Sequence, residues 1–172
     1  MNRRFVIQYF MEDDTIDIHE PPVRNSGILG GIFLGRQGVK KPDGTNYSPI
    51  DMFIGNIVDL FCHRFELLDA DEHTYKLMEN DKTFPFSNFN LLHASIAEKA
   101  SDIRQYFVKN SFIDDKIDMN DFETMTKKVG LNLNKQQLLT LWRKLDKKGR
   151  GKVSLTKLVK MASEDLFNAH LG

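Results

Sequence analysis

The chain has 172 residues, of which 41% are hydrophobic and 28% are charged, the balance of a folded protein with one large domain or two small ones. Lysine and arginine number 24, as do aspartate and glutamate, so no global field favours a nucleic acid or an anionic membrane as partner. The only cysteine, Cys62, excludes an internal disulfide and fits a reducing compartment. No stretch approaches the roughly 20 apolar residues of a membrane span, and the N-terminal apolar run is too short for a signal peptide.

The first half of the chain has the pattern of an antiparallel β domain. Its β-branched and aromatic residues come in short runs, and one run alternates apolar and polar side chains as a half-buried strand does. The acidic residues 12–14 fit a hairpin turn, and His63 with Arg64 is expected to link the last two strands. Strands are expected at residues 4–11, 15–19, 56–62 and 65–69, and a further strand is expected to begin at residues 32–34.

A helix is expected after these strands, at residues 71–80. Asp71 is able to cap its first turn, and Tyr75 and Met78 fall on one face. The segment that follows is rich in phenylalanine and contains a proline, which indicates a linker that packs between two halves. The expected domains are therefore residues 1–82 and 93–172, separated by an aromatic linker at residues 83–92.

The hydrophobic period changes to that of helices in the second half. Asn120 with Glu123, and Asn134 with Gln137, have the spacing of capping boxes that start helices. Helix, loop, helix, a link at Gly130, and again helix, loop, helix is the layout of a paired EF-hand unit. The apolar stripes consist of Leu92, Ile96, Ala100, Ile103 and Phe107; of Leu138, Leu141, Trp142 and Leu145; and of Leu155, Leu158, Val159, Ala162 and Leu166.

Residues 146–157 have the frame of an EF-hand calcium loop but lack most of its ligands. Such a loop places oxygen ligands at positions 1, 3, 5, 9 and 12 and a glycine at position 6. Asp146, Gly151 and Ser154 fill positions 1, 6 and 9. A hard dication needs negative oxygens, so the sequence predicts an EF-hand fold without metal binding. The three other ligand positions hold bases: Lys148, Arg150 and Lys157.

The first loop of the pair is expected at residues 110–121, with Ile117 at the position that Val153 has in the second. Phe112 stands at a ligand position, so at most weak cation binding is expected. Four acids and one base leave this loop at −3, whereas five bases and one acid leave the second at +4. Attraction between them would hold the two hands together without metal, but two solvated loops remain the open alternative. The candidate ligands are Asn110, Asp114, Asp118 and Asp121.

Two separated motifs stand out in the first half of the chain. The first includes Glu12-Asp13-Asp14-Thr15-Ile16, His19-Glu20-Pro21 and Gly30-Gly31-Ile32-Phe33-Leu34, and the second includes Phe53-Ile54-Gly55, His63-Arg64-Phe65 and Leu67-Leu68-Asp69-Ala70-Asp71-Glu72. Together they resemble the DM-ten domain. The likeness covers about residues 3–80, and an EF-hand follows, as in the C-terminal part of myoclonin-type EF-hand proteins of cilia. Flagellar protofilament-ribbon proteins and one ciliary nucleoside diphosphate kinase carry the same domain. Relatives of the myoclonin type usually carry three such domains, whereas this chain has one.

The resemblance implies a small barrel-like β domain similar to a pleckstrin-homology fold, and residence inside the doublet microtubules of the axoneme. We therefore expect an α+β protein with an N-terminal antiparallel β domain and a helical EF-hand pair. It is expected to be a non-enzymatic structural protein of the ciliary or flagellar axoneme. The expected partners are tubulin and other doublet microtubule proteins, with no cofactor, nucleic acid or membrane.

The basic run near the C-terminus is the candidate contact with tubulin, which is acidic overall, although a solvated face is the commoner meaning of such a run. The alternative function is a calcium-responsive EF-hand regulatory protein of cilia, which needs residues 110–121 to bind calcium. A fragment of a nucleotide kinase and a phosphoinositide-binding module are further alternatives. The candidate partner-binding residues are Arg143, Lys144, Lys147, Lys148, Arg150, Lys152, Lys157 and Lys160.

Overall fold

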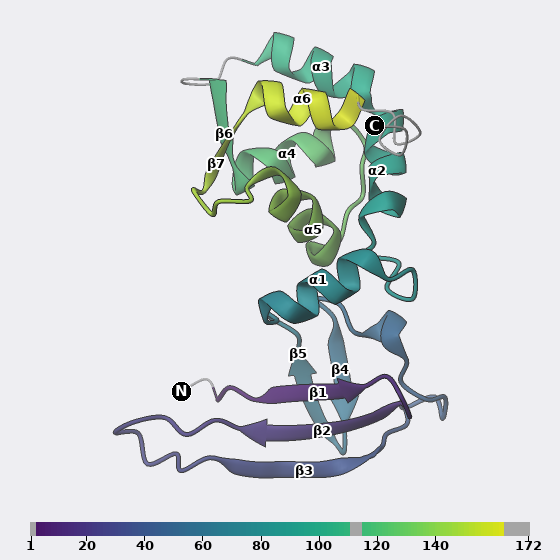
Figure 1. Ribbon diagram of the computed structural model, residues 1–172, viewed down its shortest axis with the longest axis vertical. Helices are drawn as coiled ribbons and strands as arrows, with labels where there is room; N and C mark the ends of the chain where they lie inside the picture. The colour runs from purple at the N-terminus through teal and green to yellow at the C-terminus, as the bar shows by residue number, and fades with distance from the viewer. Residues whose placement is uncertain (1–2, 111–114, 164–172) are drawn as a thin grey trace. The chain divides into compact units, whose positions relative to one another are not determined.

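The computed structural model describes residues 3–110 and 115–163 (Figure 1). The chain divides into two compact units, one formed by Met1–Met52 and Asn56–Leu67, the other by Phe53–Gly55 and Leu68–Gly172. The chain therefore passes from the first unit to the second after Leu67. The linker expected at residues 83–92 lies within the second unit, because the helix before it packs with the helices that follow.

Antiparallel strands build the first unit, as expected from the sequence. β1 (Val6–Phe10), β2 (Thr15–Glu20) and β3 (Gly31–Gly38) form one sheet in the order β1-β2-β3. β4 (Ile57–Leu60) and β5 (His63–Glu66) form a separate hairpin. Within the described part of the chain these five strands make two sheets and no closed barrel.

The core of the first unit lies on one side of the three-stranded sheet. Ile16 and Ile18 alternate with polar residues along β2 and are almost completely buried, at 0% and 1% exposure. Ile7 of β1 pairs with Ile18 in the antiparallel register, so both strands turn the same apolar face inward. Val58 and Leu60 of β4 complete the same cluster.

The tight link in the second hairpin differs from the expected one at His63 and Arg64. The turn residues are Phe61 and Cys62, with φ angles of 50° and 61°, and His63 already pairs with Leu60. A two-residue turn with two positive φ angles matches the twist of the flanking strands, but asparagine and glycine usually occupy it. Phe61 and Cys62 have the β propensity of strand residues, which is why the sequence pattern extended the strand through them.

Helix α1 (Glu72–Asn80) begins the main part of the second unit. The Asp71 side chain accepts a hydrogen bond from the backbone N–H of Thr74, so the predicted cap is confirmed. Tyr75 and Met78 are buried on one face, also as predicted.

Residues Phe53–Gly55 belong to this second unit although both neighbouring segments belong to the first. The backbone N–H of Ile54 donates to Oε1 of Gln136, at 2.8 Å, and the Phe53 ring meets the Phe86 ring edge-on. Gln136 is 1% exposed, so this hydrogen bond satisfies a buried amide.

Five further helices follow in the described residues. The single apolar stripe from Leu92 to Phe107 is divided between two of them, because Lys99 leaves the helical conformation with a ψ of 9°. The Asn134–Gln137 capping box is confirmed, whereas the one expected at Asn120 is formed two residues earlier, by Asp118 and Asp121. The helices are α2 (Phe89–Glu98), α3 (Ala100–Lys109), α4 (Met119–Lys128), α5 (Lys135–Leu145) and α6 (Leu155–Ser163).

The last four helices have the layout of an EF-hand pair. Gly130, with a φ of 85°, links α4 to α5. β6 (Lys116–Asp118) and β7 (Lys152–Ser154) pair with each other (Figure 1). Ile117 lies directly opposite Val153, which is the alignment expected from the sequence. Ile117 and Phe122 are fully buried in the core of this unit. Among the described residues, no helix combines the length and apolarity needed to cross a membrane.

Candidate interaction surface at the second EF-hand loop

The loop between α5 and β7 keeps the shape of an EF-hand loop through its own hydrogen bonds. Oδ1 of Asp146 accepts from the backbone N–H of Arg150 at 2.9 Å, and Oδ2 accepts from that of Gly151 at 2.8 Å. Gly149 and Gly151 both have positive φ angles, of 64° and 81°, which glycine adopts without steric cost. Ser154 Oγ then accepts from the N–H of Lys157 in the first turn of α6. One carboxylate and one hydroxyl therefore organise the whole turn.

These contacts also set the charge state of Asp146. The N–H groups of Arg150 and Gly151 hold the pKa of the Asp146 carboxyl below its ordinary value, and the charges of Lys157 and Arg150 add to the effect. Asp146 is therefore ionised at neutral pH, and both of its carboxylate oxygens accept hydrogen bonds from backbone N–H groups of the loop.

The donor set of this loop does not fit a calcium ion. The side chains at ligand positions 3, 5 and 12 are Lys148, Arg150 and Lys157, and all three are exposed. Ammonium and guanidinium groups have no lone pair to offer a cation and repel it. The described residues contain no cluster of three or more acidic, histidine or cysteine side chains suited to a metal.

The candidate ligands of the first loop have local roles wherever they are described. Asp118 caps α4 by accepting from the N–H of Asp121, and the Asp121 carboxylate accepts from the N–H of Asp118 in return. Asn110 ends α3, and both its backbone N–H and its side-chain amide donate to the carbonyl of Tyr106. Asp114 and Phe112 lie outside the described residues.

The two loops meet through the short β6–β7 ladder. Asp118 lies opposite Lys152 in the register, so one acid of the first loop faces one base of the second. No ion pair is formed between the described residues of the two loops, so any attraction between them acts over longer distances. The electrostatic contribution to their pairing stays a prediction.

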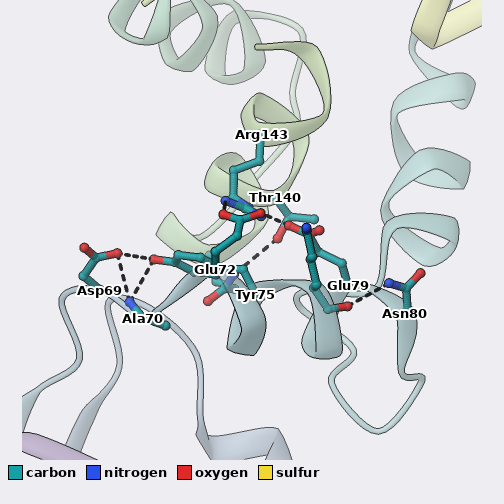
Figure 2. A network of polar contacts seen from close by, with 10 residues as sticks. Asp69, Ala70, Glu72, Tyr75, Glu79, Asn80, Thr140 and Arg143 are labelled. Atoms are coloured by element: carbon teal, nitrogen blue, oxygen red, sulfur yellow. Dashed lines mark hydrogen bonds and ion pairs between the residues drawn. The ribbon is translucent and has the colours of Figure 1, made fainter. Parts of the chain in front are cut away.

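Arg143 differs from the other predicted partner-binding residues, because its charge is paired within the chain. Figure 2 shows its guanidinium group between two acids of α1. It binds both carboxylate oxygens of Glu72, at 2.8 and 2.9 Å, and its Nε donates to Glu79 at 2.6 Å. It also lies over the ring of Tyr75, 4.5 Å from the centroid. This arrangement joins α5 to α1.

The network shifts the pKa values of three side chains: Glu72, Tyr75 and Arg143. The hydrogen bonds between Arg143 and Glu72 lower the pKa of the Glu72 carboxyl and raise the pKa of the Arg143 guanidinium above its ordinary value. Burial, followed by the hydrogen bond that its hydroxyl donates to Asp69, raises the pKa of Tyr75 to about 12. Glu72, Tyr75 and Glu79 share one helix face at i, i+3 and i+7, and this spacing is the only signal in the sequence that points to the network.

Six of the remaining predicted bases form what we call the basic surface. Lys144 is set apart from it, because its ammonium group lies 4.7 Å from the centroid of the Phe89 ring. The other six are exposed and form no ion pair with any described residue. They lie in the loop, in β7 and at exposed positions of α6. The basic surface consists of Lys147, Lys148, Arg150, Lys152, Lys157 and Lys160.

The fold and this loop define a mixed α+β protein in which strands precede an EF-hand pair with a basic second loop. Residues 1–74 match the family model of the DM10 domain. The chain is 52% identical to human EF-hand domain-containing protein 1 over 85 residues, which is 46% of this chain and 13% of that protein. It is 35% identical to EF-hand domain-containing family member C2 of Bos taurus over 158 residues, 84% of this chain and 22% of that protein.

A third relative, EF-hand domain-containing family member C2 of Danio rerio, is 28% identical over 95% of this chain and 24% of its own length. The chain therefore carries a DM10 domain and is a homologue of the EF-hand domain-containing proteins, which confirms the family resemblance. It spans less than a quarter of the length of these relatives.

Proposed function

We propose that the chain is a non-enzymatic structural protein of the ciliary or flagellar axoneme that binds tubulin inside doublet microtubules and stabilises them. The DM10 domain supports the class of protein, and the resemblance to DM-ten proteins of cilia is the ground for proposing the axoneme as its location. The observation that carries the mode of binding is the basic surface, which has six exposed cations with no ion pair among the described residues.

The physical argument is one of charge complementarity. Cations that are paired within a chain gain little from a second acidic partner, whereas unpaired ones attract an acidic surface such as that of tubulin. Asp146 and Ser154 hold the loop with hydrogen bonds, so the cations are presented on a preorganised backbone. An EF-hand loop of this kind replaces metal binding with docking.

Charge reversal tests the surface. We expect the double variant Lys147→Glu/Lys160→Glu to bind open tubulin sheets about tenfold more weakly in co-sedimentation, because two exposed attractions become repulsions. Neither residue stands at a calcium-ligand position, so the variant leaves metal chemistry unchanged. The matched control, Lys82→Glu/Lys128→Glu, makes the same change of net charge at exposed lysines outside the basic surface.

The location has its own test. A tagged copy expressed in ciliated cells should remain with the axoneme through detergent and moderate salt. Recovery of the protein wholly in the soluble fraction would contradict the proposal. Equal sedimentation of the two double variants with tubulin would remove the basic surface as the contact while leaving the location to be judged separately.

A further inference from the structure

The outer edge of β3 has no partner strand in the described structure. β3 is the last strand of the order β1-β2-β3 and pairs only with β2 among the residues described (Figure 1). Its eight residues span roughly 27 Å at the usual rise of a strand. Two register shifts against β2 bend it and divide the pairing into shorter runs.

This edge lacks the side chains that usually protect an exposed strand. It contains neither lysine nor proline, and three of its eight residues are glycine. Its single charge, Arg36, lies over the ring of Phe10 at 3.8 Å and pairs with Glu12 and Asp13, back across the sheet. Leu29, just before the strand, and Ile32, its second residue, are 90% and 83% exposed. The register shifts bend the edge, but without lysine or proline and with exposed apolar side chains it still offers a template for strand addition.

An open hollow of about 640 Å³ adjoins the other end of the strand. It is lined by Gly38 and the residues after it, and by the turn of the β4–β5 hairpin. Three bases and one acid line it: Lys40, Lys41 and Arg64, with Asp59. Lys41 pairs with Asp51 and Arg64 with Asp59, whereas Lys40 is exposed and forms no ion pair with a described residue. The hollow is therefore positive.

The rim of the hollow carries a strained aromatic residue. Phe61 lines it, has a φ of 50° and is 50% exposed. A phenylalanine at positive φ is a genuine outlier, and such outliers cluster where a side chain serves binding. The turn thus holds an apolar contact beside the positive hollow.

We propose that the free edge of β3 and the adjoining hollow form a docking site for an extended segment of another protein, which pairs its backbone with β3 and places an acidic group in the hollow. Backbone N–H and C=O groups in a row recognise only an extended polypeptide, and the hollow adds side-chain selectivity. Apolar side chains of the segment would cover Ile32, and the acid would meet Lys40.

A second copy of the chain does not fit this site. In an antiparallel pair of β3 strands, the hollow of one copy would face the start of β3 in the other. Residues 21–32 contain one base, Arg24, and no acid. Glu20 lies opposite Gly31 at the start of β3, but Arg3 already binds both of its carboxylate oxygens, so this end of the strand offers no unpaired negative charge to the hollow. A parallel pair would bring two positive hollows together. The site belongs to the first unit and the basic surface to the second, and the two share no residue, so this proposal does not depend on the function proposed above.

The test starts from a phage library of random peptides of about twelve residues, long enough to run along β3. Selection on the full chain should enrich alternating apolar residues followed or preceded by aspartate or glutamate. A synthetic copy of the enriched peptide should slow hydrogen exchange of the Gly31–Gly38 amides. Enrichment without acidic residues, protection elsewhere, or no enrichment over the bare support would overturn the proposal.

Two exposed substitutions give the site its controls. Ile32→Lys places a guard on the edge, and Lys40→Glu reverses the charge of the hollow; each should weaken the selected peptide at least tenfold. Lys128→Glu should leave the affinity unchanged, and equal binding to all four proteins would refute the site. Light scattering measures whether a second copy of the chain occupies the edge instead. A dimer of the wild type that Ile32→Lys dissociates would assign the edge to a second copy and overturn the proposal of a segment from another protein.

Discussion

The loop of residues 146–157 should bind calcium once its three basic ligand positions are changed. The triple variant Lys148→Asp/Arg150→Asp/Lys157→Glu supplies carboxylates at positions 3, 5 and 12, while Asp146 and Ser154 already stand at positions 1 and 9. The net charge of the loop falls from +4 to −2. The frame needs no rebuilding, because Gly151 and the Asp146 hydrogen bonds already shape the turn.

The expected stabilisation by calcium follows from the affinity of EF-hand sensor proteins for this ion. With a dissociation constant of about 10⁻⁵ M, about 1 mM calcium stabilises the folded state by roughly 2.7 kcal/mol. For a chain of this size that corresponds to a rise in melting temperature of about 5–10 °C. Without calcium the variant should melt below the wild type, because four acids then share one loop.

Titration calorimetry measures the binding, and thermal melting followed by circular dichroism measures the stabilisation. The matched control, Lys148→Gln/Arg150→Gln/Lys157→Gln, removes the same cations without supplying carboxylates and should show no calcium-dependent shift. The wild type should likewise give no shift from this loop. A triple acidic variant that is folded yet takes up no calcium at about 1 mM would show that charge alone does not explain the loss of metal binding.

Four other measurements address the remaining features. Arg143→Ala should cost about 1–3 kcal/mol, because Glu79 is left without its partner, and Arg143→Lys should restore only part of the loss in urea denaturation. The double variant Phe61→Asn/Cys62→Gly should raise the stability of the first unit by about 1 kcal/mol, because both turn residues have positive φ angles; an unchanged melt would argue against the strain. Arg143 lowers the pKa of Glu72 in the folded state, so this ion pair stabilises the fold fully above about pH 4.3, the ordinary pKa of glutamate, and the stabilisation is lost as the pH falls through the lower pKa of the folded state. Glu72→Gln should therefore make the melting temperature depend less on pH in that range. If the opposite charges of the two loops hold the hands together, the wild type should melt lower in about 1 M salt than in about 0.05 M, and identical melts would end that idea.

Local pattern was sufficient wherever one residue type or one short spacing sets the structure. The hairpin of β1 and β2, the Asp71 cap and the Asn134 capping box all depend on patterns within a few neighbouring residues. The alignment of Ile117 with Val153 also followed from position in the loop frame, because an EF-hand pair joins its loops at that residue. The family resemblance rested on motifs that local sequence displays directly.

Local pattern failed where a longer-range or conformational choice decided the outcome. The hairpin turn at Phe61 and Cys62 has strand-forming residues in a conformation that they rarely adopt. The helical stripe that begins at Leu92 is interrupted at Lys99, although its apolar spacing continues without a break.

By itself, the sequence determined that a β-rich part precedes an EF-hand pair and that bases occupy three calcium-ligand positions of the second loop. Residue types and their spacing along the chain specify both. Only the tertiary structure decided which of those bases are already paired, since Arg143 meets Glu72 and Glu79 from residues far away in the chain. It also decided that β3 ends its sheet and that a positive hollow adjoins it. Partner choice within a fold depends on distances that the linear order of residues does not contain.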